Sequence, residues 1–403
     1  MVVSAHPAYD WSPTLSLLLL GTLLALVPLV WLIVRSRRSA DDPAQRLHQL
    51  RLLILFLTFD LVVFGAFTRL TDSGLGCPDW PGCYGSATPL GAHQAIALAE
   101  QTLPTGPVTH QKAWIEMVHR YWAMVVGALI LWLCVWGTWV WSRSPLLQRH
   151  RLLPPVWNWA LLLWVCLQGA FGAWTVTFKL MPVIVTGHLL LALGLLALMA
   201  WSFAKSQMLL TTAAHSFSVA AGGVRRKTVA AVMGLLWAQI ALGAWVSTNY
   251  AVLACQDFPT CQGQWWPAMD FGPGFTVWRP LGLQADGQPL PFPALTAIHM
   301  AHRTMAVVVL GAMGGLAWRL RSCGVRRRLA AALAALMFLQ ALTGISNVVL
   351  AWPLVAALLH TAGAAALVIV LTLLLAVPVQ REQAAMCSCR HDVGQCAGEG
   401  GIV

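Results

Sequence analysis

Residues 65–83 read GAFTRLTDSGLGCPDWPGC, and residues 243–261 read GAWVSTNYAVLACQDFPTC. The two stretches align without a gap, and each follows a long apolar run and ends in two cysteines separated by five residues. Self-similarity at two places in one chain is the signature of a repeated structural unit. The sequence therefore predicts that one helix-and-loop element occurs twice.

Two further blocks repeat in the same order. Residues 117–126, MVHRYWAMVV, match residues 300–309, MAHRTMAVVV. The third block keeps its spacing in both copies and consists of Gln168, Gly172 and His188 against Gln340, Gly344 and His360. Three blocks in one order are not expected by chance, so we predict a duplication of the whole unit.

The composition is that of an integral membrane protein. Of the 403 residues 58% are hydrophobic and 10% are charged, whereas a soluble domain is about 25% charged. Disorder is excluded because it needs low hydrophobicity. A spanning helix needs about 20 apolar residues, and Arg clusters between long runs favour helices over a barrel. Nine segments qualify: Thr14–Val34, Leu52–Leu70, Trp114–Trp141, Val156–Val176, Val183–Phe203, Val229–Val246, Ala297–Trp318, Leu329–Val349 and Leu354–Val377.

The basic residues predict the orientation of these spans. With the N-terminus outside, 19 of the 25 Lys and Arg residues fall in inner loops and the C-terminal tail, and 3 fall in outer loops. This split obeys the positive-inside rule. Topology therefore explains the net charge of +11, and we expect no nucleic-acid partner.

The repeat and the spans together predict an all-α polytopic membrane protein with nine transmembrane helices. Four crossings return the chain to its starting side, so the two units are parallel repeats rather than inverted ones. We predict two parallel-repeat four-helix bundles plus one extra N-terminal helix. The expected divisions are the extra helix and an inner loop at 1–50, a first unit at 51–205, a cytoplasmic linker at 206–227, a second unit at 228–377 and a disordered cytoplasmic tail at 378–403.

Four of the twelve histidines lie inside predicted spans and pair under the repeat: His119, His188, His302 and His360. Each lies within about two turns of the outer end of its helix. A single buried histidine is usually a hydrogen-bonded core residue, but ionisable groups at this depth are costly and usually functional. Zinc or copper would need further ligands at the same level. Two facing histidines in a bundle instead suit haem iron, so we expect one bis-His haem site in each unit.

Neighbouring charges suggest different roles for the two sites. Arg120 and Arg303 directly follow two of these histidines and are candidates for pairing with haem propionates, although an arginine snorkelling to the interface is an alternative. Glu116 lies one turn before His119, whereas its counterpart before His302 is His299. This difference suggests that one haem is a substrate with Glu116 as proton acceptor or water-orienting group, and that the other is a redox cofactor. An ordinary interfacial carboxylate is the alternative.

The cysteines of the two repeated loops, Cys77 with Cys83 and Cys255 with Cys261, lie on the outer side, where oxidation is permitted. The spacing of these cysteines also permits metal binding. No loop histidine is duplicated together with the cysteines, however, so we favour two intraloop disulfides. We expect structural roles for Cys134, Cys166 and Cys323. The tail cysteines, Cys387, Cys389 and Cys396, suggest a metal site or, on the reducing inner face, a disordered segment. Asp60 lies within a span without a nameable partner.

These residues together resemble the haem A synthase family of bacterial plasma membranes and mitochondrial inner membranes. The resemblance runs from about residue 52 to 377 and is carried by GAFTRLTDSGL at 65–75, EMVHR at 116–120, IHMAHR at 298–303 and the two later histidines. It implies conversion of haem O to haem A by oxidation of a porphyrin methyl group to formyl through successive hydroxylations.

The resemblance also implies residue roles and partners. His119 and His188 would hold haem O with Glu116 catalytic, and His302 and His360 would ligate a haem B cofactor. It further implies a Cys77–Cys83 disulfide, haem O delivery by a haem O synthase, and a plasma-membrane location with a periplasmic N-terminus and cytoplasmic C-terminus. The family is usually described with eight spans, so the ninth at the N-terminus is a departure.

Two other functions stay open from the sequence. A dihaem cytochrome b-like electron carrier would hold two permanent, similar haems and would not need Glu116. A haem transporter would pass its substrate through the bundle unchanged. The sequence also leaves open the electron acceptor, the redox activity of the first cysteine pair and whether the chain forms a homo-oligomer.

Overall fold

The computed structural model describes residues 12–38, 42–212, 226–321 and 324–376, and the nine predicted spans are present there as nine helices. No β-strand occurs within these ranges, which confirms the all-α prediction. The spanning helices are α1 (Ser12–Arg38), α2 (Pro43–Leu70), α4 (His110–Arg143), α6 (Pro155–Thr177), α7 (Pro182–Thr212), α8 (Arg226–Thr248), α10 (Phe292–Leu320), α11 (Gly324–Val349) and α12 (Leu354–Ala376). The predicted disordered or metal-binding tail, with its three cysteines, and Cys323 lie outside the described residues.

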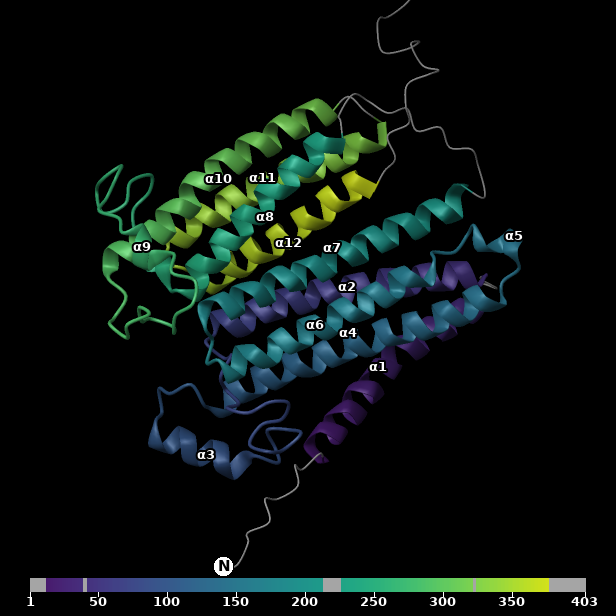
Figure 1. The fold of residues 1–403 in the computed structure, drawn as a ribbon, viewed down its shortest axis with the longest axis horizontal. Coiled ribbons are helices and arrows are strands. Elements are labelled where there is room, and N and C mark those ends of the chain that lie inside the picture. The colour runs from purple at the N-terminus through teal and green to yellow at the C-terminus, as the bar shows by residue number, and fades with distance from the viewer. Residues whose placement is uncertain (1–11, 39–41, 213–225, 322–323, 377–403) are drawn as a thin grey trace, which may run out of the picture.

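The helices form two groups that lie side by side (Figure 1). In the first, α2 packs on α4 and α7, and α6 packs on the same two helices. In the second, α8 packs on α10 and α12, and α11 packs on these two. The contacts correspond pair by pair, which supports the predicted division into two four-helix units; that division stays a prediction.

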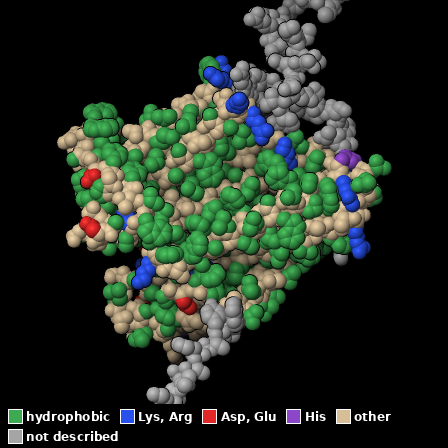
Figure 2. Space-filling view, in the orientation of Figure 1, with side chains coloured by type: hydrophobic (Ala, Val, Ile, Leu, Met, Phe, Trp, Pro, Cys, Tyr) green, Lys and Arg blue, Asp and Glu red, His purple; other side chains and the backbone are tan. Residues whose placement is uncertain are grey.

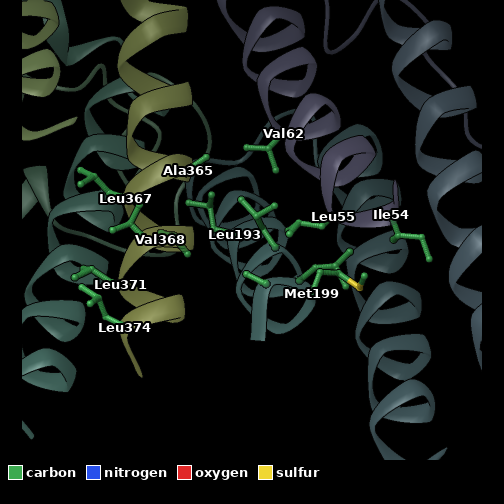
Figure 3. Packing of buried hydrophobic residues seen from close by; sticks show 14 of the residues in the cluster. Ile54, Leu55, Val62, Leu193, Met199, Ala365, Leu367, Val368, Leu371 and Leu374 are labelled. Carbon is green, nitrogen blue, oxygen red and sulfur yellow. The ribbon is translucent and has the colours of Figure 1, made fainter. Parts of the chain in front are cut away.

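The two groups meet along α2 and α7 on one side and α8 and α12 on the other. Figure 3 shows apolar side chains of this seam, with Leu55 and Val62 of α2 and Leu193 of α7 facing Ala365 and Val368 of α12. All of them are buried. Inside a bilayer the hydrophobic effect does not drive such contacts, so close packing of side chains holds the groups together.

Four shorter helices complete the described structure: α3 (His93–Thr102), α5 (Leu146–Arg149), η1 (Ala251–Ala254) and α9 (Phe271–Gly274). Three of them lie in two long loops, residues 71–109 and 249–291, at one end of the bundle. We call this the loop end. Figure 2 shows a surface that is apolar along the helices, with most visible Lys and Arg side chains gathered at the opposite end.

The extra helix α1 lies against α4 and has a smaller contact with α2. Leu17 is buried in a cluster with Met117 of α4, and a Cβ atom on Gly21 would lie 2.7 Å from that of Met124. Most other large side chains of α1 are exposed, as expected for a helix that faces lipid. This helix therefore supports the helix that carries Glu116 and His119.

At the loop end a polar bridge joins the two groups. Arg69, in the last turn of α2, donates a hydrogen bond of 2.6 Å to the carbonyl oxygen of Ser247 in α8 and one of 3.1 Å to the hydroxyl of Tyr250. That hydroxyl donates to Asp72 at 2.5 Å, and the guanidinium lies 4.3 Å from the Tyr250 ring centroid. Residues of the first repeated motif, Arg69 and Asp72, thus contact residues of the second motif, Ser247 and Tyr250.

Candidate functional site

The four intramembrane histidines lie near the loop end, on α4, α7, α10 and α12. His119 and His188 are close enough to interact electrostatically, as are His302 and His360. Each group of helices thus brings together the two histidines that the sequence analysis paired. Within the described residues no three His, Cys, Asp or Glu side chains form a metal cluster. Two imidazoles suffice for haem iron because the porphyrin supplies its other ligands.

Each of these imidazole rings packs against a glycine of a neighbouring helix. A Cβ atom added to Gly65 would lie 3.0 Å from Cε1 of His119, and one added to Gly243 would lie 2.9 Å from Cε1 of His302. The equivalent distances are 3.2 Å from Gly172 to His188 and 3.3 Å from Gly344 to His360. Such contacts are too tight for a larger residue without movement, so glycine sets how closely each ring approaches its neighbouring helix.

Three of the four histidines also contact a glutamine placed one turn before that glycine. Nε2 of Gln168 lies 3.2 Å from Nδ1 of His188, and Nε2 of Gln239 lies 3.1 Å from Nδ1 of His302. Gln168 and Gln340 belong to the third repeated block, whereas Gln239 matches no glutamine in the first unit and was not predicted. The recurring spacing of glutamine and glycine, at 168 and 172, 239 and 243, and 340 and 344, was the available signal.

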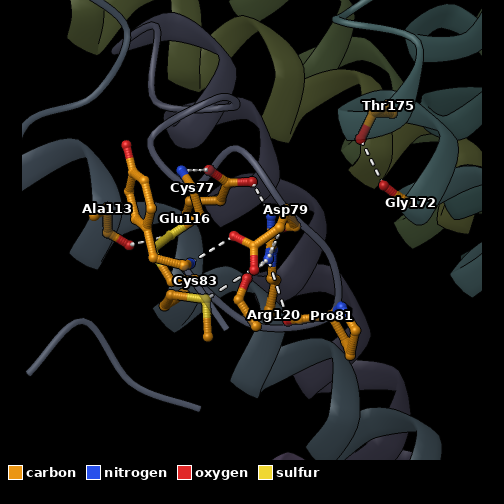
Figure 4. A network of polar contacts seen from close by, with 12 residues as sticks. Cys77, Asp79, Pro81, Cys83, Ala113, Glu116, Arg120, Gly172 and Thr175 are labelled. Carbon is orange, nitrogen blue, oxygen red and sulfur yellow. Dashed lines mark hydrogen bonds and ion pairs between the residues drawn. A yellow bond between two sulfur atoms is a disulfide. The ribbon is translucent and has the colours of Figure 1, made fainter. Parts of the chain in front are cut away.

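Glu116 lies at the centre of a buried polar network (Figure 4). Glu116 is buried, with only 4% of its surface exposed. Oε2 accepts a hydrogen bond of 2.8 Å from the backbone N–H of Cys77, and Oε1 pairs with Nη2 of Arg120 at 2.5 Å. The carboxylate is therefore fixed between α4 and the first cysteine loop.

Arg120 holds the same loop through its backbone. Its Nη1 donates hydrogen bonds to the carbonyl oxygens of Asp79 at 2.9 Å, Pro81 at 3.2 Å and Gly82 at 2.5 Å. These contacts use Nη1 of the guanidinium, and the ion pair with Glu116 uses one N–H of Nη2. The predicted contact of Arg120 with a haem propionate stays a prediction.

The second group repeats the arginine contact without the carboxylate. Arg303 donates to the carbonyl oxygens of Thr260 at 2.9 Å and Asp257 at 3.0 Å. His299 replaces Glu116: its Nδ1 lies 3.0 Å from the carbonyl oxygen of Ala251, and its Nε2 accepts from Nε of Arg303 at 3.2 Å. Glu116 and His299 therefore occupy equivalent positions in the two groups of helices, and of these two positions only the first holds a buried acid.

Both predicted disulfides are present. The Cα atoms are 4.9 Å apart in Cys77–Cys83 and 4.8 Å apart in Cys255–Cys261, and all four cysteines are buried. A carboxylate closes each loop, because Asp79 accepts from the backbone N–H groups of Tyr84 and Gly85, and Asp257 accepts from those of Gln262 and Gly263.

The loop carboxylate of the second group should protect its disulfide in a pH-dependent way. The Thr260 hydroxyl, helped by backbone N–H groups, lowers the pKa of Asp257 to about 2. Because this value lies below the ordinary one, the carboxylate stabilises the loop above about pH 4. That stabilisation is lost as the pH falls towards 2.

We therefore expect Asp257→Asn to speed reduction of Cys255–Cys261 by a water-soluble phosphine several-fold at pH 7. The ratio of mutant to wild-type rates should fall below about pH 4 and approach one only below pH 2, since the wild-type carboxyl is half protonated at its pKa of about 2. The rate for Cys77–Cys83 in the same samples is the control. Equal rates for both proteins at pH 7 would show that Asp257 does not protect the loop.

The remaining predicted polar residues lie apart from these networks. Asp60 is partly buried on α2, and its side chain makes no hydrogen bond or ion pair with another described residue. Of the free thiols, Cys134 is buried on α4 and Cys166 is exposed on α6. Neither thiol forms a disulfide within the described residues.

Residues 48–372 match the COX15-CtaA family, described as cytochrome oxidase assembly proteins. The chain belongs to this family. The match begins within α2 and ends within α12, so it includes both histidine pairs and both disulfide loops and excludes α1.

Several proteins named heme A synthase resemble the chain over most of their length. A protein named heme A synthase from Shewanella oneidensis is 35% identical over 324 residues, which cover 80% of this chain and 93% of that protein. Heme A synthases of Caulobacter vibrioides and of Caulobacter sp. strain K31 are each 30% identical and cover 79% and 78% of this chain.

Proposed function

We propose that this chain converts haem O into haem A, by oxidising a porphyrin methyl group to formyl through successive hydroxylations. The observation that carries the proposal is the buried Glu116, which lies one turn before His119 and has no acidic counterpart before His302. An electron carrier with two equivalent haems would have no use for this asymmetry. The full-length similarity to proteins named heme A synthase supports the same reaction.

In this proposal haem O is the substrate of the first unit and is held by His119 and His188. Haem B is the cofactor of the second unit and is held by His302 and His360. The surroundings of both pairs suit such a group, because several buried polar atoms near the rings lack a hydrogen-bond partner: His119 Nδ1, Gln168 Oε1 and Gln239 Oε1. Bound haem B would supply one-electron redox chemistry.

Glu116 is the proposed proton acceptor or water-orienting group. Arg120 and the Cys77 N–H fix both carboxylate oxygens, so the group is held in one position before substrate arrives. Its burial keeps bulk water away from the proton that it handles. Arg120 and Arg303, at the same level of each unit, remain the candidates for pairing with haem propionates.

The proposal also assigns a location and partners. The clustering of basic side chains at the end opposite the loops supports a plasma-membrane protein with periplasmic loops, a periplasmic N-terminus and a cytoplasmic C-terminus. A haem O synthase would deliver the substrate, an electron acceptor of undetermined identity would receive electrons, and the product would serve oxidase assembly. A homo-oligomer is compatible with the exposed apolar helix faces.

Co-expression with a haem O synthase, followed by extraction and chromatography of the haems, tests the function. We expect haem A or its hydroxylated intermediate to appear only when the full chain is present. Folded protein that contains haem B and unchanged haem O would rule out the synthase and favour the transporter. Two permanently bound haem B groups would instead favour the electron carrier.

A further inference from the structure

Three of the four proposed iron ligands are held by a glutamine from the neighbouring helix. Gln168, Gln239 and Gln340 each lie four residues before the glycine that touches the histidine ring. Each Nε2 donates to the backbone carbonyl oxygen of that histidine, at 3.1, 3.2 and 2.8 Å respectively. The glutamine therefore fixes the helix turn that carries the ligand.

The same three rings have a polar neighbour at Nδ1. In His188 and His302 this neighbour is Nε2 of the glutamine amide, which also lies 3.4 Å from the ring Nε2, and in His360 it is the hydroxyl of Thr343 at 2.9 Å. When Nε2 of a histidine binds a metal, Nδ1 carries the proton, and an oxygen that accepts it fixes the ring orientation and strengthens the bond to the metal. The Thr343 hydroxyl can accept in this way, and Gln168 and Gln239 each keep a buried Oε1 without a partner that is available for the same role. Loss of such a partner typically costs about 10–100-fold in metal affinity.

His119 lacks this support. The position four residues before Gly65 is occupied by Leu61, which is partly buried and packs in the hydrophobic core. Nδ1 of His119 is buried without a hydrogen-bond partner, and on the α2 side the ring meets Gly65 and the stacked ring of Phe64, with centroids 6.3 Å apart. Asp60 is no substitute, because it points about 100° away from Leu61 around the helix.

We propose that His119 is the exchangeable ligand of the substrate haem and that Leu61 makes it so. The proposal rests on the proposed function, since it takes the first unit as the haem O site. A substrate haem enters and leaves in every turnover, whereas a cofactor haem stays bound. A ring with apolar neighbours at Nδ1 binds iron more weakly and turns more freely than one held by glutamine. His188, held by Gln168, is then the ligand that stays attached.

Leu61→Gln in the full-length chain supplies the missing partner and tests the proposal. The protein is loaded by co-expression with a haem O synthase, and transfer of haem O to excess apomyoglobin is followed by absorbance. We expect transfer to slow about 10-fold, and carbon monoxide binding to the reduced substrate haem to slow with it. Leu61→Met is the matched control and should transfer haem O at the wild-type rate.

The second unit provides the reverse experiment. Gln239→Leu reproduces the Leu61 arrangement at His302 and should speed the loss of haem B about 10-fold, while the loss of haem O stays unchanged. An unchanged haem B rate in this variant would contradict the proposed role of the glutamine.

Wild-type transfer and carbon monoxide rates in a loaded Leu61→Gln protein would overturn the proposal. If Leu61→Gln does not fold, Gln168→Leu decides: it removes the partner of the second ligand, so haem O loss should accelerate, and an unchanged rate would overturn the proposal. Failure of the proposed function gives a different result, because wild-type protein would then carry no haem O in its first unit. That result would reject the proposed function and the proposed role of Leu61 together.

Discussion

Glu116→Gln should bind haem O and haem B in wild-type amounts and lose conversion by about 100-fold or more, the usual contribution of a positioned acid or base. The amide keeps an oxygen that accepts from the Cys77 N–H, and Arg120 keeps its contacts with the loop carbonyls. The loop should therefore hold its shape while the proton acceptor is lost. Haem A and its hydroxylated intermediate, quantified per mole of bound haem in cells that also produce haem O, give the measurement.

His299→Gln is the matched control for this substitution. It changes the corresponding position in the second unit, where the side chain contacts Ala251 and Arg303 and no acid is present. We expect this variant to retain conversion. Glu116→Ala is a harsher test, because it also leaves the Cys77 N–H and Arg120 without their partner. Full conversion by Glu116→Gln would remove the carboxylate from the mechanism.

The second large effect concerns the iron ligands. His302→Ala and His360→Ala should each reduce haem B from one per chain to almost none, since each removes one of the two histidines that would hold it. His119→Ala and His188→Ala should keep haem B and lose haem O. The measurement is extraction and chromatography of haems from purified protein, normalised to chain concentration, after co-expression with a haem O synthase.

The pattern of losses decides which unit holds which haem. Loss of haem O in His302→Ala with haem B retained would reverse the assignment of the two units. Loss of both haems in every variant would show that the pairs fold as one unit rather than as two sites. The four alanine variants thus serve as controls for one another, because they lie at equivalent depths on α4, α7, α10 and α12.

Features encoded locally could be predicted from the sequence. The nine spans follow from runs of apolar residues, and the disulfides follow from two cysteine pairs with short spacing in repeated loops. The pairing of His119 with His188 followed from their depth, since both lie near the outer ends of spans in the same unit, and the repeat places His302 and His360 in the same way. These predictions needed no knowledge of which helix faces which.

Features that depend on helix facing could not be predicted in the same way. The contact of each ring with a glycine requires that α2 face α4 and that α6 face α7, which the sequence does not specify. The contacts of Arg120 with the loop carbonyls depend on how residues 77–83 fold back over α4. Gln239 was missed because its counterpart in the first unit is Leu61, so the repeat alignment hid it.

The polar bridge between Arg69, Asp72, Ser247 and Tyr250 has a thermodynamic consequence. It ties the last turn of α2, one turn beyond the Gly65 that contacts His119, to the last turn of α8, one turn beyond the Gly243 that contacts His302. If haem binding in one unit shifts its own helix, the free energy of binding in the other changes as well. Linkage requires that this coupling be reciprocal, so the factor by which bound haem B alters haem O affinity equals the factor by which haem O alters haem B affinity.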